Sequence, residues 1–376
     1  MRRTVTYNAF LFAALVLTVS AFALARAWGF KPADEHDVMQ GKLAHAFESH
    51  YDDVFPVRTL GVSLWAALDY TLFGEGRPGV VLGKQDWLYT DEEFKLDNDA
   101  AAEVERNLAL IDWVHKELTR RGIALVVAVV PAKARVYPEY LDRRTPPPLH
   151  RDLYARVQAR LREDGIASAD LLGPLEAGKR REPTYLRTDT HWTAYGASLA
   201  AEAIAEAARA FDLGTERRDF RTKVAGKETH RGDLFNFLPL DPYFAFLLPP
   251  PDEVNRFKTE AVSAAGGGGL LGDAPAARVA LVGTSYSAEA LWNFAGALEQ
   301  ALREDVMNYA KDGKGPIEPM LAYLESKDLA SSPPRLVVWE MPERYLVARQ
   351  PLEAHHLPPG LFAAAADATS GVHSSN

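Results

Sequence analysis

Residues 278–287 read Arg-Val-Ala-Leu-Val-Gly-Thr-Ser-Tyr-Ser, and this stretch decides the fold. Its apolar part, 278–283, is a short unbroken run of the kind found in parallel strands that helices cover on both faces. A second such run, 123–130, is rich in β-branched residues and ends at Pro131. Helical patterns separate the two runs, and this alternation predicts an α/β fold, a three-layer α/β/α sandwich with a mostly parallel sheet.

Outward from these two strands, helical and extended patterns alternate along the chain. We expect helices over 38–53, 99–121, 151–163, 192–211 and 290–303, and further strands over 80–89, 306–309 and 336–340. Residues 212–276 show little periodicity, which predicts a long insertion with a flexible glycine loop at 266–269. Because ligands bind beyond the carboxyl ends of strands in such sheets, chemistry is expected after residues 130 and 283.

The N-terminus carries an export signal. Arg2 and Arg3 precede an apolar stretch over 9–25, broken only by Thr18 and Ser20. Basic residues keep the N-terminus inside, so the rest of the chain is expected outside the cytoplasm. The stretch lies near the lower limit of ~17 residues for a spanning helix. Ala23 and Ala25 resemble a signal-peptidase site, so an uncleaved anchor and a cleaved signal both remain open.

Composition excludes several classes of protein. The net charge is −9, which argues against a general nucleic-acid binder because such a protein presents a basic face. The chain contains no Cys, so thiolate catalysis, zinc–cysteine sites and disulfides are excluded. Apolar residues make up 47% of the chain, enough for a core of its own.

Ser285 is the first candidate for chemistry. The predicted strand 278–283 runs through a glycine into Thr284-Ser285-Tyr286-Ser287 and then into a helix. A hydroxyl placed there has helix N-terminal amides beside it, which can stabilise a developing oxyanion. The alternative is that Ser285 or Ser287 only caps the next helix.

Asp189 and His191 are the second candidate. They lie two residues apart just before the helix expected over 192–211. A serine nucleophile needs a base, and the base needs a carboxylate to hold its tautomer, so the two segments complement each other. The alternatives are a capping Asp beside a buried His, or a metal pair completed by His230 and Asp233. No recognised metal-ligand spacing supports the metal alternative.

Five motifs resemble one family. They are GKQDWLY at 83–89, PAKARVYPEYL at 131–141, DTHWTAYG at 189–196, GTSYS at 283–287 and WEMPERYL at 339–346. Together they resemble, in the same order, the alginate O-acetyltransferase family of AlgJ and AlgX. The resemblance implies an SGNH-hydrolase-like fold in which Asp and His precede Ser, an order permuted relative to ordinary SGNH hydrolases. It assigns the catalytic roles to Asp189, His191 and Ser285.

The family resemblance also implies the biology. Such proteins act in the periplasm and O-acetylate mannuronate residues of alginate through a Ser-linked acetyl group, with no metal or other cofactor. The expected partners are the polysaccharide acceptor, an AlgI-like membrane-bound O-acyltransferase that supplies acetyl groups, other exopolysaccharide secretion proteins, and the inner membrane through the N-terminal segment. The lack of a long C-terminal extension resembles AlgJ rather than AlgX.

These observations divide the chain into four parts. Residues 1–30 are expected to be the membrane anchor or signal, 31–79 an N-terminal helical segment, 80–350 the SGNH-like acetyltransferase domain, and 351–376 a disordered tail.

Further residues are candidates for substrate contact. The amide of Ser285 or Tyr286 is expected to donate to the oxyanion. Lys133 and Arg135 follow the strand 123–130 and could attract a uronate carboxylate, or could be solvated loop charges. Trp192 and Tyr195 could stack on sugar rings, although aromatic residues beside motifs are more often packed in the core.

Three rival functions use the same sequence. The acceptor could be another exopolysaccharide such as cellulose, since none of the motifs names the sugar. The same site could act as a polysaccharide acetylesterase if water replaces the sugar hydroxyl. A non-catalytic scaffold of a secretion complex is a third alternative, against which the complete set of Asp189, His191 and Ser285 argues.

Overall fold

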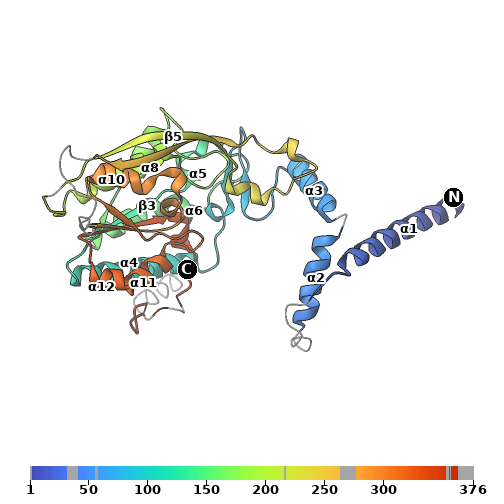
Figure 1. The fold of residues 1–376 in the computed structure, drawn as a ribbon, viewed down its shortest axis with the longest axis horizontal. Helices are drawn as coiled ribbons and strands as arrows, with labels where there is room; N and C mark the ends of the chain where they lie inside the picture. The colour runs from blue at the N-terminus through green and yellow to red at the C-terminus, as the bar shows by residue number, and fades with distance from the viewer. Residues whose placement is uncertain are drawn as a thin grey trace, which may run out of the picture. The chain divides into compact units, whose positions relative to one another are not determined.

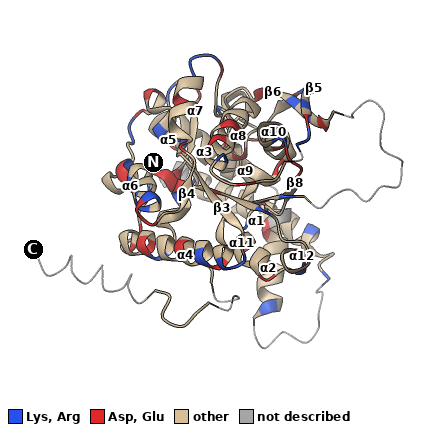
Figure 2. Ribbon diagram, turned by 90° about the vertical axis from the view of Figure 1, so that its left-hand side faces the viewer, with Lys and Arg blue, Asp and Glu red and all other residues tan. Residues whose placement is uncertain are grey.

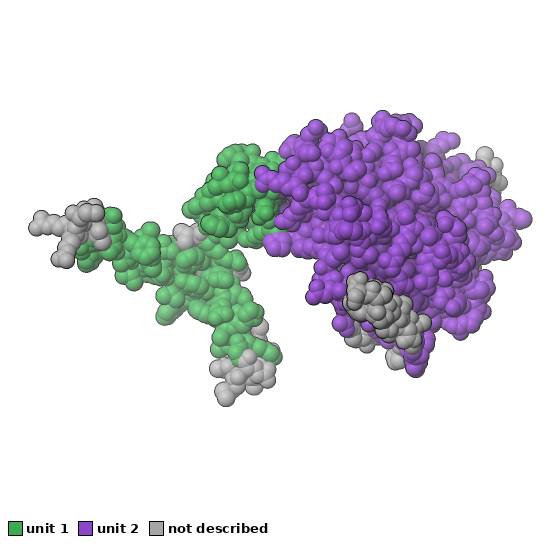
Figure 3. Space-filling model, turned by 180° about the vertical axis from the view of Figure 1, so that it is seen from behind, with its two compact units in different colours: residues 1–77, 236–249 green, residues 78–235, 250–376 purple. Residues whose placement is uncertain are grey.

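The computed structural model of this chain describes residues 2–31, 41–55, 58–215, 217–262, 277–352, 355 and 357–362. The chain divides into two compact units, drawn in separate colours in Figure 3. Unit 1 contains residues 1–77 and 236–249, and unit 2 contains 78–235 and 250–376. The sequence suggested a purely N-terminal helical segment before residue 80. The structure adds a distant piece of chain, 236–249, to that segment.

Unit 2 is built on one parallel sheet. Its strands are β3 (Ala124–Val130), β4 (Ala167–Ser168), β7 (Val279–Val282), β8 (Val306–Asn308) and β9 (Leu336–Pro342). Their order across the sheet is β4-β3-β9-β7-β8, and every neighbouring pair is parallel. The two apolar runs of the sequence, β3 and β7, therefore flank β9, and their carboxyl ends share one edge.

Strict alternation along the central strands fills two cores. On β3, Val126, Ala128 and Val130 pack into one core, and Leu125, Val127 and Val129 pack into the other. Helices α8 (Ala194–Ala208) and α10 (Phe294–Leu302) cover the first face. Helices α4 (Ala100–Arg120), α6 (Pro148–Glu163) and α11 (Ile317–Leu324) cover the second (Figure 1). The predicted three-layer α/β/α architecture is confirmed.

Most charged residues lie outside this apolar centre, and Glu340 on β9 is a buried exception. In Figure 2 the acidic and basic residues colour the helices and loops around the sheet, while β3 has none. The remaining short helices of unit 2 are α5 (Lys133–Val136), α7 (Leu172–Gly178), α9 (Ser285–Ala288) and α12 (Lys327–Ser331). The short turns of 3-10 helix in this unit are η3 (Asp91–Glu93), η4 (Pro138–Tyr140), η7 (Ala290–Trp292) and η8 (Glu343–Val347).

The extended segment 80–89 is not one strand. It forms an antiparallel hairpin of β1 (Val80–Leu82) and β2 (Leu88–Thr90). Gln85 and Asp86 in the turn have φ of 54° and 64°, in the left-handed region that reverses the chain. Gly83 has no room for a side chain, because a Cβ there would lie 2.5 Å from the Tyr140 carbonyl oxygen.

The region 212–276 was wrongly predicted to be a weakly structured insertion. It contains β5 (Phe220–His230) and β6 (Asp252–Ala261), which pair as a long antiparallel ribbon with a bulge between Val224 and Gly226. Both strands are polar and mostly exposed or half-buried, so they lack the apolar alternation by which a strand is recognised. The glycine run at 266–269 and most of the C-terminal tail lie outside the described residues.

Unit 1 is helical. It contains α1 (Arg2–Ala27), α2 (Lys42–Val54), α3 (Arg58–Leu68), the π-helix η2 (Asp69–Phe73) and η6 (Ala245–Leu247). η5 (Asp233–Phe237) spans the junction of the two units. Within α1, residues Thr6–Ala27 are long and apolar enough to cross a membrane. The start of the helix predicted over 38–53 lies outside the described residues. The 236–249 segment is tied to α3 by a hydrogen bond of 2.9 Å from Ser63 Oγ to the Asp241 carbonyl.

Candidate active site

The nucleophile candidate sits in the turn after β7. Thr284 caps the short helix α9, and Ser285 is its first residue. The Thr284 amide donates to Glu340 Oε2 at 2.7 Å, and the Ser287 hydroxyl donates to the same oxygen at 2.9 Å. Gly283 is required here, because a Cβ would come within 2.4 Å of that oxygen. Glu340 of β9 thus fixes the turn on both sides of Ser285.

Glu340 is fully buried next to this turn. Burial raises the pKa of its carboxyl, while the hydrogen bonds from Thr284 and Ser287 oppose the rise. A carboxylate in such a position accepts several hydrogen bonds at once and so holds their donors in one geometry. We assign it a structural part in the site, since it contacts residues on either side of Ser285 rather than the hydroxyl itself.

The structure brings Ser285, His191 and Asp189 into one hydrogen-bonded series. His191 Nε2 lies 2.7 Å from Ser285 Oγ, and His191 Nδ1 lies 2.6 Å from Asp189 Oδ1. The same Asp189 oxygen accepts from the His191 amide at 2.8 Å. This arrangement places the ring proton on Nδ1 and leaves the Nε2 lone pair directed at the serine hydroxyl.

The second oxygen of Asp189 has its own donors. His230 Nε2 lies 2.8 Å from Asp189 Oδ2, and the Asp233 amide donates to it at 3.0 Å. Burial by itself would raise the pKa of Asp189, but the hydrogen bonds from His191 and His230 and the charge of His191 hold it well below its usual range. The hydrogen bond to Asp189 raises the pKa of His230. Asp189 is therefore a carboxylate shared between two imidazoles.

Asp233 completes the surroundings of His191. Its side chain accepts from the amide of Thr190 at 2.8 Å and from the Thr190 hydroxyl at 2.5 Å, and its Oδ2 lies 3.8 Å from His191 Nδ1. Burial and the nearby Asp189 charge raise the pKa of Asp233. Gly232 permits this approach, because a Cβ there would lie 2.1 Å from the Thr188 carbonyl oxygen.

Asp189, His191 and Asp233 are close enough together to be considered as a metal site. Their arrangement fits proton transfer better. A metal on His191 Nδ1 would displace the hydrogen bond to Asp189 and force the remaining proton onto Nε2. His191 could then no longer accept the proton of Ser285. The two uses of the cluster exclude each other.

Aromatic rings hold the imidazole on both sides. The Trp292 ring stacks on His191 with a centroid distance of 4.7 Å and an interplanar angle of 17°. The Tyr286 ring lies 4.7 Å from His191 on a tilted plane, and its hydroxyl donates to the Thr190 carbonyl at 2.5 Å. These contacts restrict the rotation of the ring that must face Ser285.

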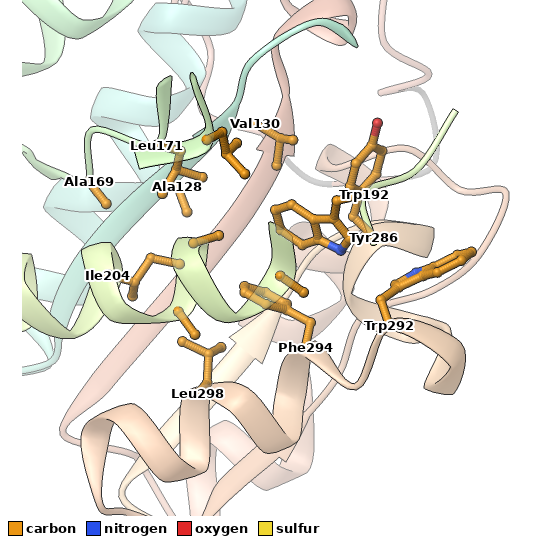
Figure 4. Packing of buried hydrophobic residues seen from close by; sticks show 14 of the residues in the cluster. Ala128, Val130, Ala169, Leu171, Trp192, Ile204, Tyr286, Trp292, Phe294 and Leu298 are labelled. Carbon is orange, nitrogen blue, oxygen red and sulfur yellow. The ribbon is translucent and has the colours of Figure 1, made fainter. Parts of the chain in front are cut away.

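Two aromatic candidates for substrate contact are buried instead. Trp192 is fully buried and packs against Tyr286 and Phe294, with centroid distances of 5.1 and 4.7 Å (Figure 4). The Tyr286 side chain is buried as well, and its amide donates to Thr284 Oγ1 at 3.3 Å. The structure therefore contradicts sugar stacking by Trp192. Of the two amides considered for the oxyanion, that of Ser285 lies at the helix N-terminus, where no acceptor within the helix is available.

Lys133 and Arg135 are also absent from the substrate side. The Lys133 ammonium is buried and donates to the carbonyls of Leu88, Arg187 and Asp189 at 2.6, 2.9 and 2.9 Å. Burial lowers its pKa to about 8. Arg135 forms a two-pronged ion pair with the buried Glu343. Both cations are fully used by the protein, so neither is available to a uronate.

A groove of about 470 Å³ opens beside the site. Its wall includes Trp292, which stacks on His191, and Tyr195, the one aromatic substrate candidate that keeps access to solvent. Arg187 and the acidic residues Glu182 and Glu253 also line it.

The sequence reading missed several supporting residues. Glu340 lies in an otherwise apolar strand pattern, and this isolated Glu was the signal from which its supporting role could have been predicted. Asp252, at the start of β6, accepts from the amide and hydroxyl of Thr188 at 2.9 and 2.6 Å. Nothing in the sequence relates it to Thr188, because the two residues meet only through the ribbon that was not recognised.

The fold and the site define the class of this protein. A permuted Asp-His and Ser set at the carboxyl edge of a parallel α/β/α sheet is an SGNH hydrolase-like acyltransferase site. A family model described as the SGNH hydrolase-like domain of the acetyltransferase AlgX matches residues 80–343. The chain belongs to this family of SGNH hydrolase-like O-acetyltransferases.

Known relatives agree with that assignment. The chain is 51% identical over 343 residues to the probable alginate O-acetylase AlgJ of Pseudomonas aeruginosa, covering 89% of this chain and 88% of that protein. It is 50% identical over 338 residues to the protein of the same name from Azotobacter vinelandii, covering 89% and 87%.

Two solved structures are similar as well. The O-acetyltransferase domain of Pseudomonas putida AlgJ superposes with a TM-score of 0.70 at 46% identity, covering 78% of this chain and all of that domain. AlgX of Pseudomonas aeruginosa gives a TM-score of 0.54 at 28% identity, covering 71% and 66%. The predicted fold class, family and enzyme class are confirmed.

Proposed function

We propose that this chain O-acetylates alginate outside the cytoplasm, with Ser285 as nucleophile, His191 as general base and Asp189 as its orienting carboxylate. One observation supports this most strongly. The 2.7 Å contact between His191 Nε2 and Ser285 Oγ continues through Nδ1 to a carboxylate. The alginate acceptor follows from relatives that are named alginate O-acetylases and match nearly the whole chain.

The reaction proceeds in two acyl transfers. In the first, His191 takes the Ser285 proton while Oγ attacks the acetyl carbonyl, and the leaving group then receives that proton. In the second, His191 takes the proton of a sugar hydroxyl, which attacks the acetyl-serine. The acetyl–Oγ bond breaks, and the proton returns to Ser285. The amide of Ser285 stabilises the oxyanion in both steps. Asp189 stabilises the imidazolium each time it forms.

The groove provides the acceptor site. Arg187 lines it with a side chain that is 27% exposed, donates to the Pro250 carbonyl and lies 4.0 Å from Asp252, and its guanidinium is the proposed contact to the acceptor in place of Lys133 and Arg135. A guanidinium pairs well with a carboxylate such as that of a uronate. Tyr195 and Trp292 supply aromatic surface for the sugar ring. The polymer therefore meets one cation and two rings beside the nucleophile.

The membrane and its proteins are the proposed context. The helix Thr6–Ala27 anchors the chain in the inner membrane and leaves the remainder in the periplasm, since Arg2 and Arg3 stay inside. A membrane-bound O-acyltransferase of the AlgI type is the proposed source of acetyl groups, and other secretion proteins present the polymer.

An acceptor assay tests the proposal. Purified full-length protein is incubated with an artificial acetyl ester and oligomannuronate, and mass spectrometry follows both products. We expect acetylated oligosaccharide, and acetyl on Ser285 when the acceptor is omitted. Ser285→Ala should give neither. Release of free acetate with no acetylated sugar would instead identify an esterase. Acetylation of a cellulose oligomer in preference to oligomannuronate would reassign the polymer.

A further inference from the structure

An exposed apolar face on unit 1 has no use in the chemistry described so far. We define the α3 face as Leu60, Leu64, Trp65, Leu68 and Leu72, on α3 and the following η2. The four leucines recur every fourth residue, and Trp65 directly follows Leu64, so the five positions lie on one side of the helix. All five side chains are exposed, and Trp65 and Leu72 each retain 67% of their surface.

The opposite side of α3 is covered by protein. Ser63 and Ala67 are buried, and Ser63 is bonded to the Asp241 carbonyl of the 236–249 segment. The helix is therefore held on unit 1 by one face while the other remains apolar and open. From Thr59 to Leu68 the sequence contains no ionisable residue, which is unusual for a helix face in contact with water.

Two further groups in unit 1 have the same character. Trp28, directly after α1, is 91% exposed, and a Trp at the end of a membrane span is typical of the interfacial belt. In the 236–249 segment, Tyr243 and Phe246 are exposed, the latter at 79%. Exposed apolar surface of this extent marks an interaction site in a soluble or peripheral protein.

We infer that the α3 face lies in the headgroup–acyl boundary of the bilayer leaflet from which α1 emerges. The inference rests on the proposal that α1 is an anchor and the rest of the chain is exported. Given that anchor, residues 28–57 tether α3 to the membrane surface, so even weak insertion is favoured by a high effective concentration. A bilayer also needs no shape complementarity, only an apolar face with Leu and Trp.

Charge specifies the lipid requirement. Between residues 58 and 77 the charged residues are Arg58, Asp69, Glu75 and Arg77, two of each sign. Many interfacial helices gain affinity from basic residues and anionic lipids. The α3 face has no such excess, so its insertion depends on apolar burial and should not depend on lipid charge.

The absence of cysteine makes the test direct. Single-cysteine variants of the full chain at Leu64 and Leu72 are labelled with a fluorophore and reconstituted in phosphatidylcholine vesicles. Brominated lipid serves as the bilayer quencher, and iodide on both sides as the aqueous quencher. Matched labels at Leu15 in α1 and at Lys116 on the exposed surface of α4 give the lipid and water references.

We expect labels at 64 and 72 to lose fluorescence in brominated lipid, as at 15, and to resist iodide, unlike at 116. Phosphatidylglycerol should not change the result. Leu64→Glu should abolish the lipid quenching at 72, whereas Lys116→Glu should not. Quenching of 64 and 72 by iodide alone, with 15 still in lipid, would overturn the inference but not the anchor. Shielding from both quenchers would overturn it in favour of contact with a second copy. A label at 15 outside the lipid would refute the anchor itself.

Discussion

Two strand ends at the same edge of the sheet have opposite uses. β3 ends at Val130 and leads to Lys133 and Arg135, and β7 ends at Val282 and leads to Ser285. Both follow fully buried apolar strands, with β9 between them. At the β3 end the Lys133 ammonium is enclosed, and both Lys133 and Arg135 are bonded to protein acceptors. At the β7 end the Ser285 hydroxyl is half-exposed and faces His191.

This difference shows how much can be predicted from the rule that ligands bind beyond the carboxyl ends of parallel strands. It locates both segments correctly, because parallel strands present their carboxyl ends on one side. It does not separate residues that react from residues that hold the reacting ones. Lys133 belongs to the second kind, because its ammonium donates to the carbonyl of Asp189 and so fixes the backbone of the proposed catalytic loop.

The largest expected effect is at the β7 end. Ser285→Ala should lower acetyl transfer at least ~10³-fold, because the nucleophile and base act as one unit and only binding and oxyanion stabilisation remain. The thermal midpoint should be unchanged, since this half-exposed hydroxyl contributes little packing. Turnover is measured with an artificial acetyl ester, and the fold by circular dichroism. Normal activity in a folded Ser285→Ala protein would remove the β7 end from the chemistry.

At the β3 end we expect a substitution to lower the stability of the fold. Lys133→Met leaves three buried carbonyls without their shared donor and should lower the free energy of unfolding by ~2–4 kcal/mol. Lys116→Met, at an ammonium that is 67% exposed, is the matched control and should change it by less than ~0.5 kcal/mol. Urea denaturation measures both. A stable Lys133→Met protein with an altered KM for acceptor would place Lys133 among the substrate contacts after all.

His230 lies between these extremes. His230→Ala removes a donor from Asp189 and should lower turnover by roughly tenfold, as for loss of an orienting partner. His230→Gln can still donate and should recover part of the rate. The failure of Gln to improve on Ala would show that the imidazole acts by something other than this hydrogen bond.

The same residue predicts a pH dependence of stability. The pKa of His230 is raised in the folded protein by its hydrogen bond to Asp189. Its contribution is therefore complete below the unfolded value of ~6.5 and is lost as pH rises through the folded value. The unfolding free energy of the wild type relative to His230→Gln should fall from pH 6 to pH 8. A constant difference would contradict the predicted shift.

The smallest expected effect is on the KM for the acceptor, and it should distinguish Arg187 from Arg135. Arg187→Gln should raise the KM for oligomannuronate by several-fold, about 1 kcal/mol for one partly exposed charge contact, with little change in turnover of an uncharged ester. Arg135→Lys keeps the β3-end charge and should leave that KM unchanged. An equal rise in KM from the charge-conserving Arg135→Lys would show that the effect does not come from the loss of a cation in the groove.

The sequence was sufficient for the elements with a strong apolar pattern. β3 and β7 were located within one or two residues, and the helix observed over Ala100–Arg120 was expected over 99–121. Asp189, His191 and Ser285 were predicted as one site because the two short motifs that contain them supply a nucleophile, a base and a carboxylate that complement one another. These features are local, and their pattern is visible in a single stretch.

What the sequence missed depends on long-range contacts. Strands β5 and β6 are mostly polar, and the few apolar residues on their half-buried side, such as Val254 and Phe257, are too scattered to distinguish them from loop. Glu340 and Gly283 make sense only as a pair, and they are far apart in the chain: Glu340 lies on β9, and Gly283 directly follows the neighbouring strand β7. The burial of Lys133 could not be foreseen, because the carbonyls that accept from its ammonium come from β2 and from the 187–189 segment, both far from it in the sequence.

The split composition of unit 1 has a consequence for biosynthesis. The buried side of α3 is covered by residues 236–249, which are made long after α3 itself. At ~5–20 residues per second, residues 69–235 take roughly 10–30 s to synthesise. Throughout that interval α3 is already outside the ribosome, and both of its sides are uncovered. Unit 1, which is synthesised first, is therefore completed late. Contact with the membrane can keep the apolar surface of α3 out of water until residues 236–249 have been synthesised.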